Sequence, residues 1–227
     1  MEVTLSHDPQ DIPVLGELNR LAYTPELASR FAFRNWPDVD NARQFYRARV
    51  TERMAHPASK VFKAVDIATG EILGFVALTL EEAEDGHEGF GDVVKAMENP
   101  TMKAVQMLPE FLNQEFILTS GAMIKGLQDR MKGGRHYYIS TLVVSPQYQR
   151  KGIGAQLMRK CLEEANKEGL PTWLISFPGS HELYLKLGFV DVEHSDVDLN
   201  EWDGGRCRGY GIYRSYAMRR GIGGENE

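Results

Sequence analysis

Two glycines in front of a predicted helix are the residues of this chain whose spacing indicates chemistry most clearly. Gly152 and Gly154 follow an apolar run at 137–144 and a short polar segment. The first N–H groups of a helix have no intrahelical partner and lie at the positive end of its dipole. Glycine leaves no Cβ in the way of a ligand. The spacing therefore predicts a site where backbone amides hold an anion such as pyrophosphate.

Three anion-binding patterns compete for this turn. A P-loop requires Lys and then Ser or Thr after its last glycine, but Ala155 and Gln156 follow Gly154. A dinucleotide-binding fingerprint requires a third glycine where Leu157 stands. The third pattern, Gln/Arg-x-x-Gly-x-Gly/Ala, is met in full by residues 149–154.

A second block of sequence agrees with the third pattern. Residues 173–177 read as a strand, and residues 181–189 as a short helix ending in Tyr-x-x-x-Gly-Phe, with Tyr184 four residues before Gly188. In these two blocks the chain resembles the GNAT superfamily of acyl-CoA N-acyltransferases, over roughly residues 136–190. The resemblance implies an α/β (α+β) fold with a mixed, mostly antiparallel central sheet flanked by helices. It also implies acetyl-CoA as co-substrate.

The resemblance further implies how the chain binds this co-substrate. The backbone N–H groups of residues 149–155 are expected to hold the pyrophosphate, and the strand edge at 142–144 to pair with the pantetheine. The N–H of Val143 or Val144 would polarise the thioester carbonyl. Basic side chains near the loop would meet the nucleotide phosphates. The expected cofactor-binding residues are Leu142, Val143, Val144, Gln149, Arg150, Lys151, Gly152, Ile153, Gly154, Ala155, Ser180, Tyr184 and Lys186.

Tyr184 has two interpretations. The resemblance places it near the sulfur, where its hydroxyl would protonate the departing thiolate. Alternatively, it is a core aromatic residue whose hydroxyl is bonded to the backbone. Ser180, on the same short helix, is expected to touch the cofactor.

The general base is not determined by the resemblance. An aliphatic ammonium group has a pKa near 10, so a base or a desolvated site must help to supply neutral amine. Protein-acetylating members often carry a Glu early on the strand before the loop, but Tyr138 occupies that position here. A glutamate-based mechanism is therefore not carried over. The candidates are Glu81, Glu82 or Glu84 after the preceding strand, Asp196 or Asp198 near the C-terminal hairpin, or a water chain.

Apolar periodicity predicts the elements that position these residues. Helices are expected from Asp8 or Asp11 to Ala22, and from Asp38 or Asp40 to about Met54. Strands are expected at 3–5, 61–66, 72–80 and 210–218. The helix after Gly152 carries an inner stripe of Ile153, Leu157, Met158, Cys161, Leu162 and Ala165.

About fifty residues separate the third predicted strand from the fourth, where the family commonly has a short turn. Residues 81–135 begin with an acidic stretch and continue with a helical pattern from Leu108 to Met131. Insertions of this length are usually functional or disordered. We expect a single acyltransferase domain over 1–220, with a helical insertion at about 81–135 that forms a lid or a partner face, and a disordered tail at 221–227.

The composition narrows the class of function. The chain has 227 residues and a formal net charge of −6, so it has no overall basic field and nucleic acid is not an expected partner. No apolar run reaches transmembrane length, and residues 1–4 carry no basic, apolar leader. Cys161 and Cys207 are far apart and form no metal-spaced pair. We expect a cytoplasmic protein that binds no metal and no membrane.

Three functions are consistent with these observations. The first is an acetyl-CoA-dependent N-acetyltransferase that acetylates a primary amine of a small molecule by direct transfer in a ternary complex. The second is a protein or peptide N-acetyltransferase acting on Lys or an N-terminal amine. The third is a non-catalytic acyl-CoA-binding regulatory module. We expect the first, with Tyr184, Glu81 and Glu82 as the candidate catalytic residues, in a monomer or a homodimer.

Overall fold

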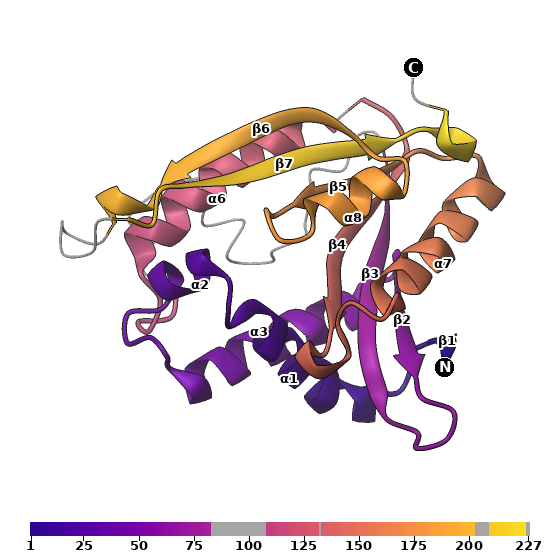
Figure 1. Cartoon of the computed structure of the whole chain (residues 1–227), viewed down its shortest axis with the longest axis horizontal. Helices are drawn as coiled ribbons and strands as arrows, with labels where there is room; N and C mark the ends of the chain where they lie inside the picture. The colour runs from indigo at the N-terminus through magenta and orange to yellow at the C-terminus, as the bar shows by residue number, and fades with distance from the viewer. Residues whose placement is uncertain (83–107, 132, 203–208, 226–227) are drawn as a thin grey trace.

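A computed structural model describes residues 1–82, 108–131, 133–202 and 209–225 of the chain. Its strands form one sheet in the order β1-β2-β3-β4-β5-β7-β6, in which β4 and β5 are parallel and every other neighbouring pair is antiparallel (Figure 1). The strands are β1 (Glu2–Leu5), β2 (Ser59–Val65), β3 (Ile72–Glu81), β4 (His136–Val144), β5 (Thr172–Ser176), β6 (Val190–Asp198) and β7 (Ile212–Arg220). The mixed, mostly antiparallel sheet that the sequence predicted is thereby confirmed.

The α-helices lie on both faces of this sheet. They are α1 (Ile12–Tyr23), α2 (Leu27–Ala32), α3 (Val39–Ala55), α6 (Gln114–Asp129), α7 (Ile153–Glu168) and α8 (His181–Lys186). Short 3-10 turns are η1 (Pro9–Asp11), η2 (Pro146–Tyr148), η3 (Leu199–Glu201) and η4 (Ile222–Gly224). No helix of the described ranges is both long and apolar enough to cross a membrane.

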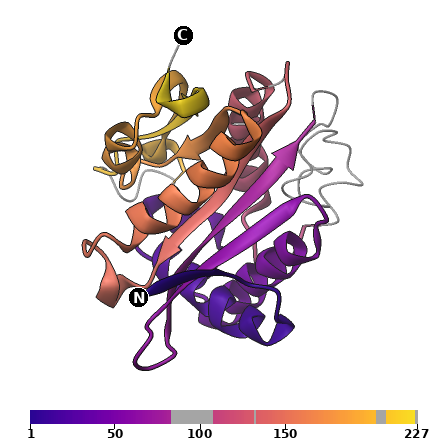
Figure 2. The ribbon, with the colours of Figure 1, turned by 90° about the vertical axis from the view of Figure 1, so that its right-hand side faces the viewer.

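The alternation of side chains along β4 defines two layers. Ile139 packs in a cluster with α7 and α8, so we call this side of the sheet the α7 face. Tyr138 packs with Leu127 of α6. After a bulge, Val143 packs with Leu15 of α1, on the same side as Tyr138, and we call this side the α6 face. Figure 2 shows α7 lying along the central strands.

The α7 helix forms because its sequence offers one apolar stripe between two glycines. Its buried residues are those that the periodicity predicted: Ile153, Leu157, Met158, Cys161, Leu162 and Ala165. Gly169 ends the helix in the left-handed conformation, with φ 64°, and its N–H bonds the carbonyl of Ala165. The predicted helix, its start after Gly152 and its inner stripe are confirmed.

The β4 and β5 strands pair only at one end. The register joins Tyr137 to Thr172 and continues to Ile139 and Leu174, where the pairing stops. At the same place Ser140 is a bulge on β4, because Ala77 of β3 faces Thr141 whereas Leu78 faces Ile139. Beyond this point, residues 140–144 of β4 and 175–176 of β5 do not pair with each other, and we call these two segments the fork.

Part of the insertion forms α6, which covers β5, β6 and β7 on the α6 face. The helix begins after Asn113, whose side chain accepts a hydrogen bond from the N–H of Phe116. It runs alongside β6 and β7 (Figure 1). It is shorter than the pattern predicted, because Leu112 forms a bridge with Phe33 in front of the helix. The insertion residues 83–107 lie outside the described ranges.

The C-terminal tail is more regular than the sequence predicted. Disorder was expected over 221–227, but Ile222–Gly224 form the 3-10 turn η4. The N–H of Gly223 donates to Asn166 Oδ1 of α7 at 3.2 Å, which attaches the turn to that helix. The last two residues of the chain lie outside the described ranges.

Candidate active site

The segment between β4 and α7 has the strand–loop–helix form that the glycine pattern predicted. After Val144 the chain makes the η2 turn and reaches Gly152, directly before α7. Gly152 has φ 81°, a conformation that strains other residues, and a Cβ there would meet open space. Gln149 Nε2 donates to the Val144 carbonyl at 3.1 Å, which closes the loop onto the strand.

The first turn of α7 presents its N–H groups at this opening. The N–H of Gln156 bonds the Gly152 carbonyl at 3.1 Å, so the N–H groups of Ile153, Gly154 and Ala155 precede the regular helical bonds. They lie at the positive end of the helix dipole, beside a residue with no side chain. The residues present therefore fit a pyrophosphate group.

Gly154 faces the gap between β4 and α8. A Cβ there would lie 3.6 Å from a methyl carbon of Leu183 and 3.7 Å from one of Val144. These are ordinary contact distances, so packing alone does not explain a glycine at this position. A ligand that approaches the helix amides closely would explain it.

The basic residues named for the phosphates are all near the surface. Arg150 is exposed and has φ 63°, a left-handed conformation that is uncommon outside glycine. Lys151 Nζ lies 5.0 Å from the centre of the Tyr148 ring. Lys186 forms an exposed ion pair of 3.3 Å with Glu182 on α8.

The edge of β4 that faces β5 is open along the fork. Val143 is paired with Phe75 of β3 on one side. On the other side β5 has diverged, so the backbone of residues 142–144 is not covered by a strand. This is where the sequence predicted that the pantetheine would pair.

Tyr184 and Ser180 lie together beside the fork. Tyr184 is 6% exposed and packs against Phe189, with ring centroids 5.9 Å apart. Burial raises the pKa of the Tyr184 hydroxyl far above its usual value, against the smaller, opposite effect of a hydrogen bond with Ser180. The phenol therefore stays protonated at neutral pH, which is the form that a proton donor requires.

The structure does not bring Glu81 and Glu82 to the fork. Glu81 is the last residue of β3 and is buried beside the start of β4, where its carboxylate lies 3.6 Å from His136 Nε2. Glu82 forms an ion pair of 2.9 Å with Arg135. Both lie at one end of the β3–β4 pair. The other end, where Gly74 pairs with Val144, leads into the glycine loop.

The other acidic candidates also have partners of their own. Asp196 forms two hydrogen bonds of 2.6 Å with the guanidinium of Arg214. Asp198 accepts hydrogen bonds from the backbone and the side chain of Asn200 at the start of η3. Glu84 lies outside the described ranges.

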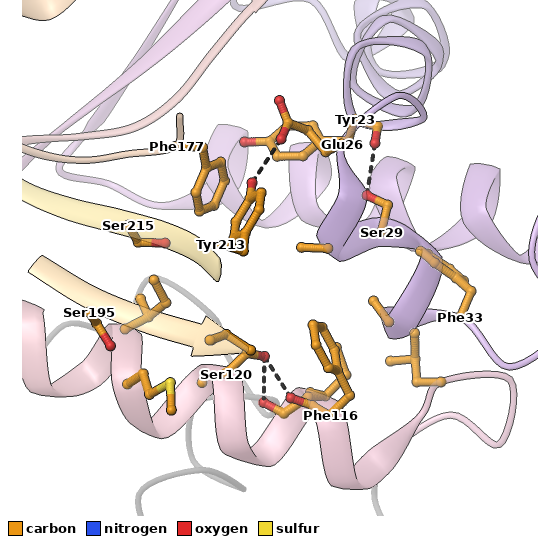
Figure 3. A pocket seen from close by; sticks show the side chains of 18 of the residues that line it. Tyr23, Glu26, Ser29, Phe33, Phe116, Ser120, Phe177, Ser195, Tyr213 and Ser215 are labelled. Carbon is orange, nitrogen blue, oxygen red and sulfur yellow. Dashed lines mark hydrogen bonds between the residues drawn. The ribbon is translucent and has the colours of Figure 1, made fainter. Parts of the chain in front are cut away.

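A cavity of about 180 Å³ lies on the α6 face, between α2 and α3 on one side and α6 on the other (Figure 3). The ends of β5, β6 and β7 form its remaining wall. Its lining is mainly aromatic and aliphatic, and is listed here: Tyr23, Glu26, Ala28, Ser29, Ala32, Phe33, Phe45, Tyr46, Arg49, Leu112, Phe116, Ile117, Ser120, Gly121, Met123, Ile124, Lys125, Gln128, Phe177, Ser195, Val197, Tyr213 and Ser215. The insertion helix therefore supplies one wall of this pocket.

Glu26 supplies the carboxylate of this pocket, and among the described lining residues it is the sole acid. The hydroxyl of Tyr213 donates to Glu26 Oε2 at 2.8 Å, as Figure 3 shows. A Cβ on Gly179 would lie 3.5 Å from Glu26 Oε1, so the carboxylate also faces the loop between β5 and α8. Glu26 thus connects the pocket to the segment that carries Ser180.

Sequence reasoning missed Glu26, because no spacing pattern marks it. It is a single acidic residue after Pro25, in front of a helix of 6 residues that is too short to show periodicity. Pro25 interrupts the segment before the second predicted helix, and this break was a signal that could have drawn attention to Glu26.

Two tyrosines of the pocket, Tyr213 and Tyr46, are held in the protonated form. Burial, and secondarily the Glu26 carboxylate, raises the pKa of Tyr213 far above its usual value. Burial also raises the pKa of Tyr46 to about 12. The pocket therefore presents phenol groups, one carboxylate and the cationic side chains of Arg49 and Lys125 within a mainly apolar wall.

Comparison with known families agrees with this geometry. Residues 113–189 match the model of the acetyltransferase (GNAT) family. The matched segment includes α6, the fork strand β4, the glycine loop and the helix that carries Tyr184. Over this segment the chain is similar to the acetyltransferase (GNAT) family.

Solved structures share the fold of this chain over almost its whole length. Arylalkylamine N-acetyltransferase 2 from Aedes aegypti superposes with a TM-score of 0.65 at 13% identity, covering 98% of this chain and 100% of that one. Histone acetyltransferase HPA2 and related acetyltransferase from Corynebacterium glutamicum gives 0.58 at 16% identity, with 97% and 95% covered. A search among curated proteins finds no match.

A further neighbour was solved with a ligand. The PaiA N-acetyltransferase of Thermoplasma acidophilum, in complex with coenzyme A, gives a TM-score of 0.55 at 13% identity, with 98% of this chain and 100% of that chain covered. At these identities the likeness establishes the GNAT fold, and the acceptor of this chain has to be argued from its own pocket.

Proposed function

We propose that this GNAT domain is an acetyl-CoA-dependent N-acetyltransferase that acetylates a primary amine of a small, partly apolar molecule. The acetyl group passes directly from the thioester to the amine in a ternary complex. The observation that carries the proposal is the aromatic pocket with its single described carboxylate, Glu26, beside the fork.

The co-substrate binds on the fork side of the domain. The free N–H groups at the start of α7 hold the pyrophosphate, as the open space at Gly152 allows. The pantetheine lies along β4 at residues 142–144, where β5 has diverged. An N–H group of this strand then polarises the thioester carbonyl.

The acceptor amine enters from the α6 face. The pocket volume of about 180 Å³ is small beside the roughly 300–1,000 Å³ of clefts for drug-sized ligands. Its walls come from α2, α3 and α6, so they enclose a small apolar body and leave little room for a polypeptide. This is the reason for preferring a small molecule to a protein acceptor.

Two side chains are suited to move protons. Glu26 lies in the pocket and accepts a hydrogen bond from Tyr213, so it is placed to take a proton from the incoming ammonium group. Tyr184 is buried and protonated beside the fork, so it is placed to donate a proton to the departing thiolate. Backbone N–H groups stabilise the developing oxyanion between them.

The test is release of free thiol from acetyl-CoA, measured against a panel of aryl amines, alkyl amines, amino sugars, polyamines and short peptides. We expect turnover with amines that carry an apolar body. Turnover with peptides alone would replace this proposal with a protein N-acetyltransferase. Tight binding of acetyl-CoA without turnover on any acceptor would favour a binding module.

A further inference from the structure

A buried arginine lies at the root of the fork. Arg53 of α3 is 7% exposed, although it carries a charge. Its Nε donates to the hydroxyl of Ser140 at 3.0 Å, and its Nη1 donates to the Arg49 carbonyl at 3.1 Å. Ser140 is the bulge residue of β4, directly after the last pair with β5. The guanidinium therefore contacts the point at which the two strands separate.

The environment of Arg53 is unusual for a structural arginine. Its hydrogen-bond partners are neutral oxygen atoms, and within the described parts of the chain no carboxylate forms an ion pair with it. Burial is the main cause that lowers the pKa of Arg53, to about 9, and the nearby charge of Arg49 adds to it. A buried charge without a counter-ion costs several kcal/mol, whereas an apolar residue would pack there at no such cost.

Arg53 also adjoins the acceptor pocket. Arg49, one helical turn before it, lines the pocket, and the Arg53 side chain folds back to bond its carbonyl. Gln128, on the opposite wall, donates to the hydroxyl of Tyr138 two residues before Ser140. Arg53 is thus between the pocket and the fork, on the face from which the amine would approach.

The Ser140 bulge is held from two directions. Its hydroxyl is bonded by Arg53, and its carbonyl accepts a hydrogen bond of 2.8 Å from Thr141 Oγ1. A bulge turns the backbone of its strand, so its exact geometry sets the direction of the N–H groups that follow. Those are the groups at residues 142–144 that the proposed function assigns to the thioester.

We propose that Arg53 is a positioning residue for acetyl transfer, which acts through Ser140 to aim the β4 N–H groups at the thioester carbonyl. The inference rests on the proposed function, because it requires acetyl-CoA in the fork. It assigns a role in the reaction to a residue that does not line the acceptor pocket itself.

The proposal predicts that changes at Arg53 affect the binding of acetyl-CoA but not the binding of coenzyme A. Coenzyme A has no acetyl carbonyl, so a misdirected N–H group in the fork weakens the binding of acetyl-CoA alone. A purely structural role of Arg53 would weaken both ligands together. The ratio of the two affinities is therefore a readout that needs no acceptor.

The experiment is calorimetric titration of both ligands into wild type, Arg53→Met, Arg53→Lys, Ser140→Ala and the Arg53→Met/Ser140→Ala double variant. We expect Arg53→Met to bind acetyl-CoA about fivefold more weakly than wild type, which corresponds to the loss of one hydrogen bond. We expect it to bind coenzyme A with the affinity of wild type. Arg53→Lys should recover part of the difference. Ser140→Ala should resemble Arg53→Met, and the double variant should be no worse than Arg53→Met.

Turnover provides the second readout. With the best amine of the panel, kcat of Arg53→Met should fall roughly tenfold, less than for complete loss of an oxyanion donor, while the KM for the amine stays within about twofold. Arg47→Met, on the exposed side of the same helix, is the matched control and should behave as wild type.

Several outcomes would overturn the inference. They are an unchanged affinity ratio in Arg53→Met and Ser140→Ala, an equal loss for both ligands, or additive losses in the double variant. If Arg53→Met does not fold, Arg53→Lys and Ser140→Ala carry the same comparison. A wild-type protein that binds no acetyl-CoA would overturn the proposed function and this inference with it.

Discussion

The glycine loop and the acceptor pocket are built in opposite ways. The loop is one continuous segment, from Ser145 to Ala155, and it offers backbone N–H groups at a helix start. The pocket is assembled from side chains that range from Tyr23 to Ser215 in the sequence. A site made of backbone is therefore encoded locally, whereas a site made of side chains exists only once the sheet and its helices have packed.

The two regions also differ in how they handle charge. The loop is open to solvent and attracts an anion through amides and a helix dipole. The pocket is enclosed by aromatic rings, and within its described lining Glu26 is the acid that could attract an ammonium group. If both assignments are correct, changes in the loop should affect cofactor affinity, and changes in the pocket should affect turnover or the acceptor.

The largest effect is expected at Glu26. Glu26→Gln keeps the shape but removes the base, so kcat should fall about 100- to 1,000-fold, while the affinity for acetyl-CoA should not change. Steady-state kinetics and calorimetry measure the two quantities separately. The same change at Glu81 and at Glu82 tests the competing carboxylates. Full activity of Glu26→Gln with a large loss in either of those variants would move the base out of the pocket.

The loop should respond in the complementary way. Gly154→Glu places a side chain and a negative charge at the amides of α7, so the affinity for coenzyme A should fall about 100-fold, equivalent to about one hydrogen bond to a charged group. The matched control is Gly126→Glu on α6, where a Cβ meets open space. Undiminished affinity in Gly154→Glu, measured by calorimetry, would remove the pyrophosphate from this loop.

Tyr184 tests the boundary between the two regions. Tyr184→Phe removes the proton donor, so kcat should fall about tenfold with little change in affinity for acetyl-CoA. Because burial raises the pKa of this hydroxyl, activity that depends on it should persist up to and beyond pH 10, the usual tyrosine value. An unchanged kcat would return Tyr184 to the role of a core aromatic residue.

The smallest effect concerns the attachment of α7 to the sheet. Hydrogen bonds from Lys60 and Lys167 lower the pKa of Glu164 to about 2. A lowered pKa stabilises the fold above the unfolded value of 4.5, and this contribution is lost as the pH falls from there towards 2. Glu164→Gln should therefore cost about 1 kcal/mol or less at pH 7 and nothing near pH 2.

Chemical denaturation at several pH values measures this difference. Glu163→Gln is the control, because its carboxylate is 60% exposed and forms a longer contact of 3.5 Å with Lys160. A Glu164→Gln effect that is the same at pH 7 and pH 2 would show that the ion pairs do not contribute.

The sequence predicted the parts of the molecule that depend on local pattern. The stripe of α7 and the glycine turn before it follow from spacing alone, because one helix face or one turn decides them. The short Tyr184 helix follows from the resemblance of residues 181–189 to the family. A cap at Asp38 or Asp40 was predicted for the same reason, and the structure shows that the Asp38 side chain accepts the hydrogen bond from Asn41 N–H.

The parts that depend on tertiary contact could not be predicted in this way. Glu26 reaches the pocket because Tyr213, at the other end of the chain, bonds it. Arg53 reads in sequence as one more basic residue of a polar helix, yet it is buried and bonds Ser140, which is 87 residues away in the sequence. Leu112 was counted as part of a helical stripe, yet it forms a bridge with Phe33.

A crystal structure of the protein with a bisubstrate analogue that joins coenzyme A to tryptamine tests the loop and the pocket together. We expect the pyrophosphate at the N–H groups of residues 152–155, the linkage in the fork, and the indole between α3 and α6 with Glu26 near the former amine. An indole outside that pocket, or a pyrophosphate away from the α7 N-terminus, would contradict this expectation.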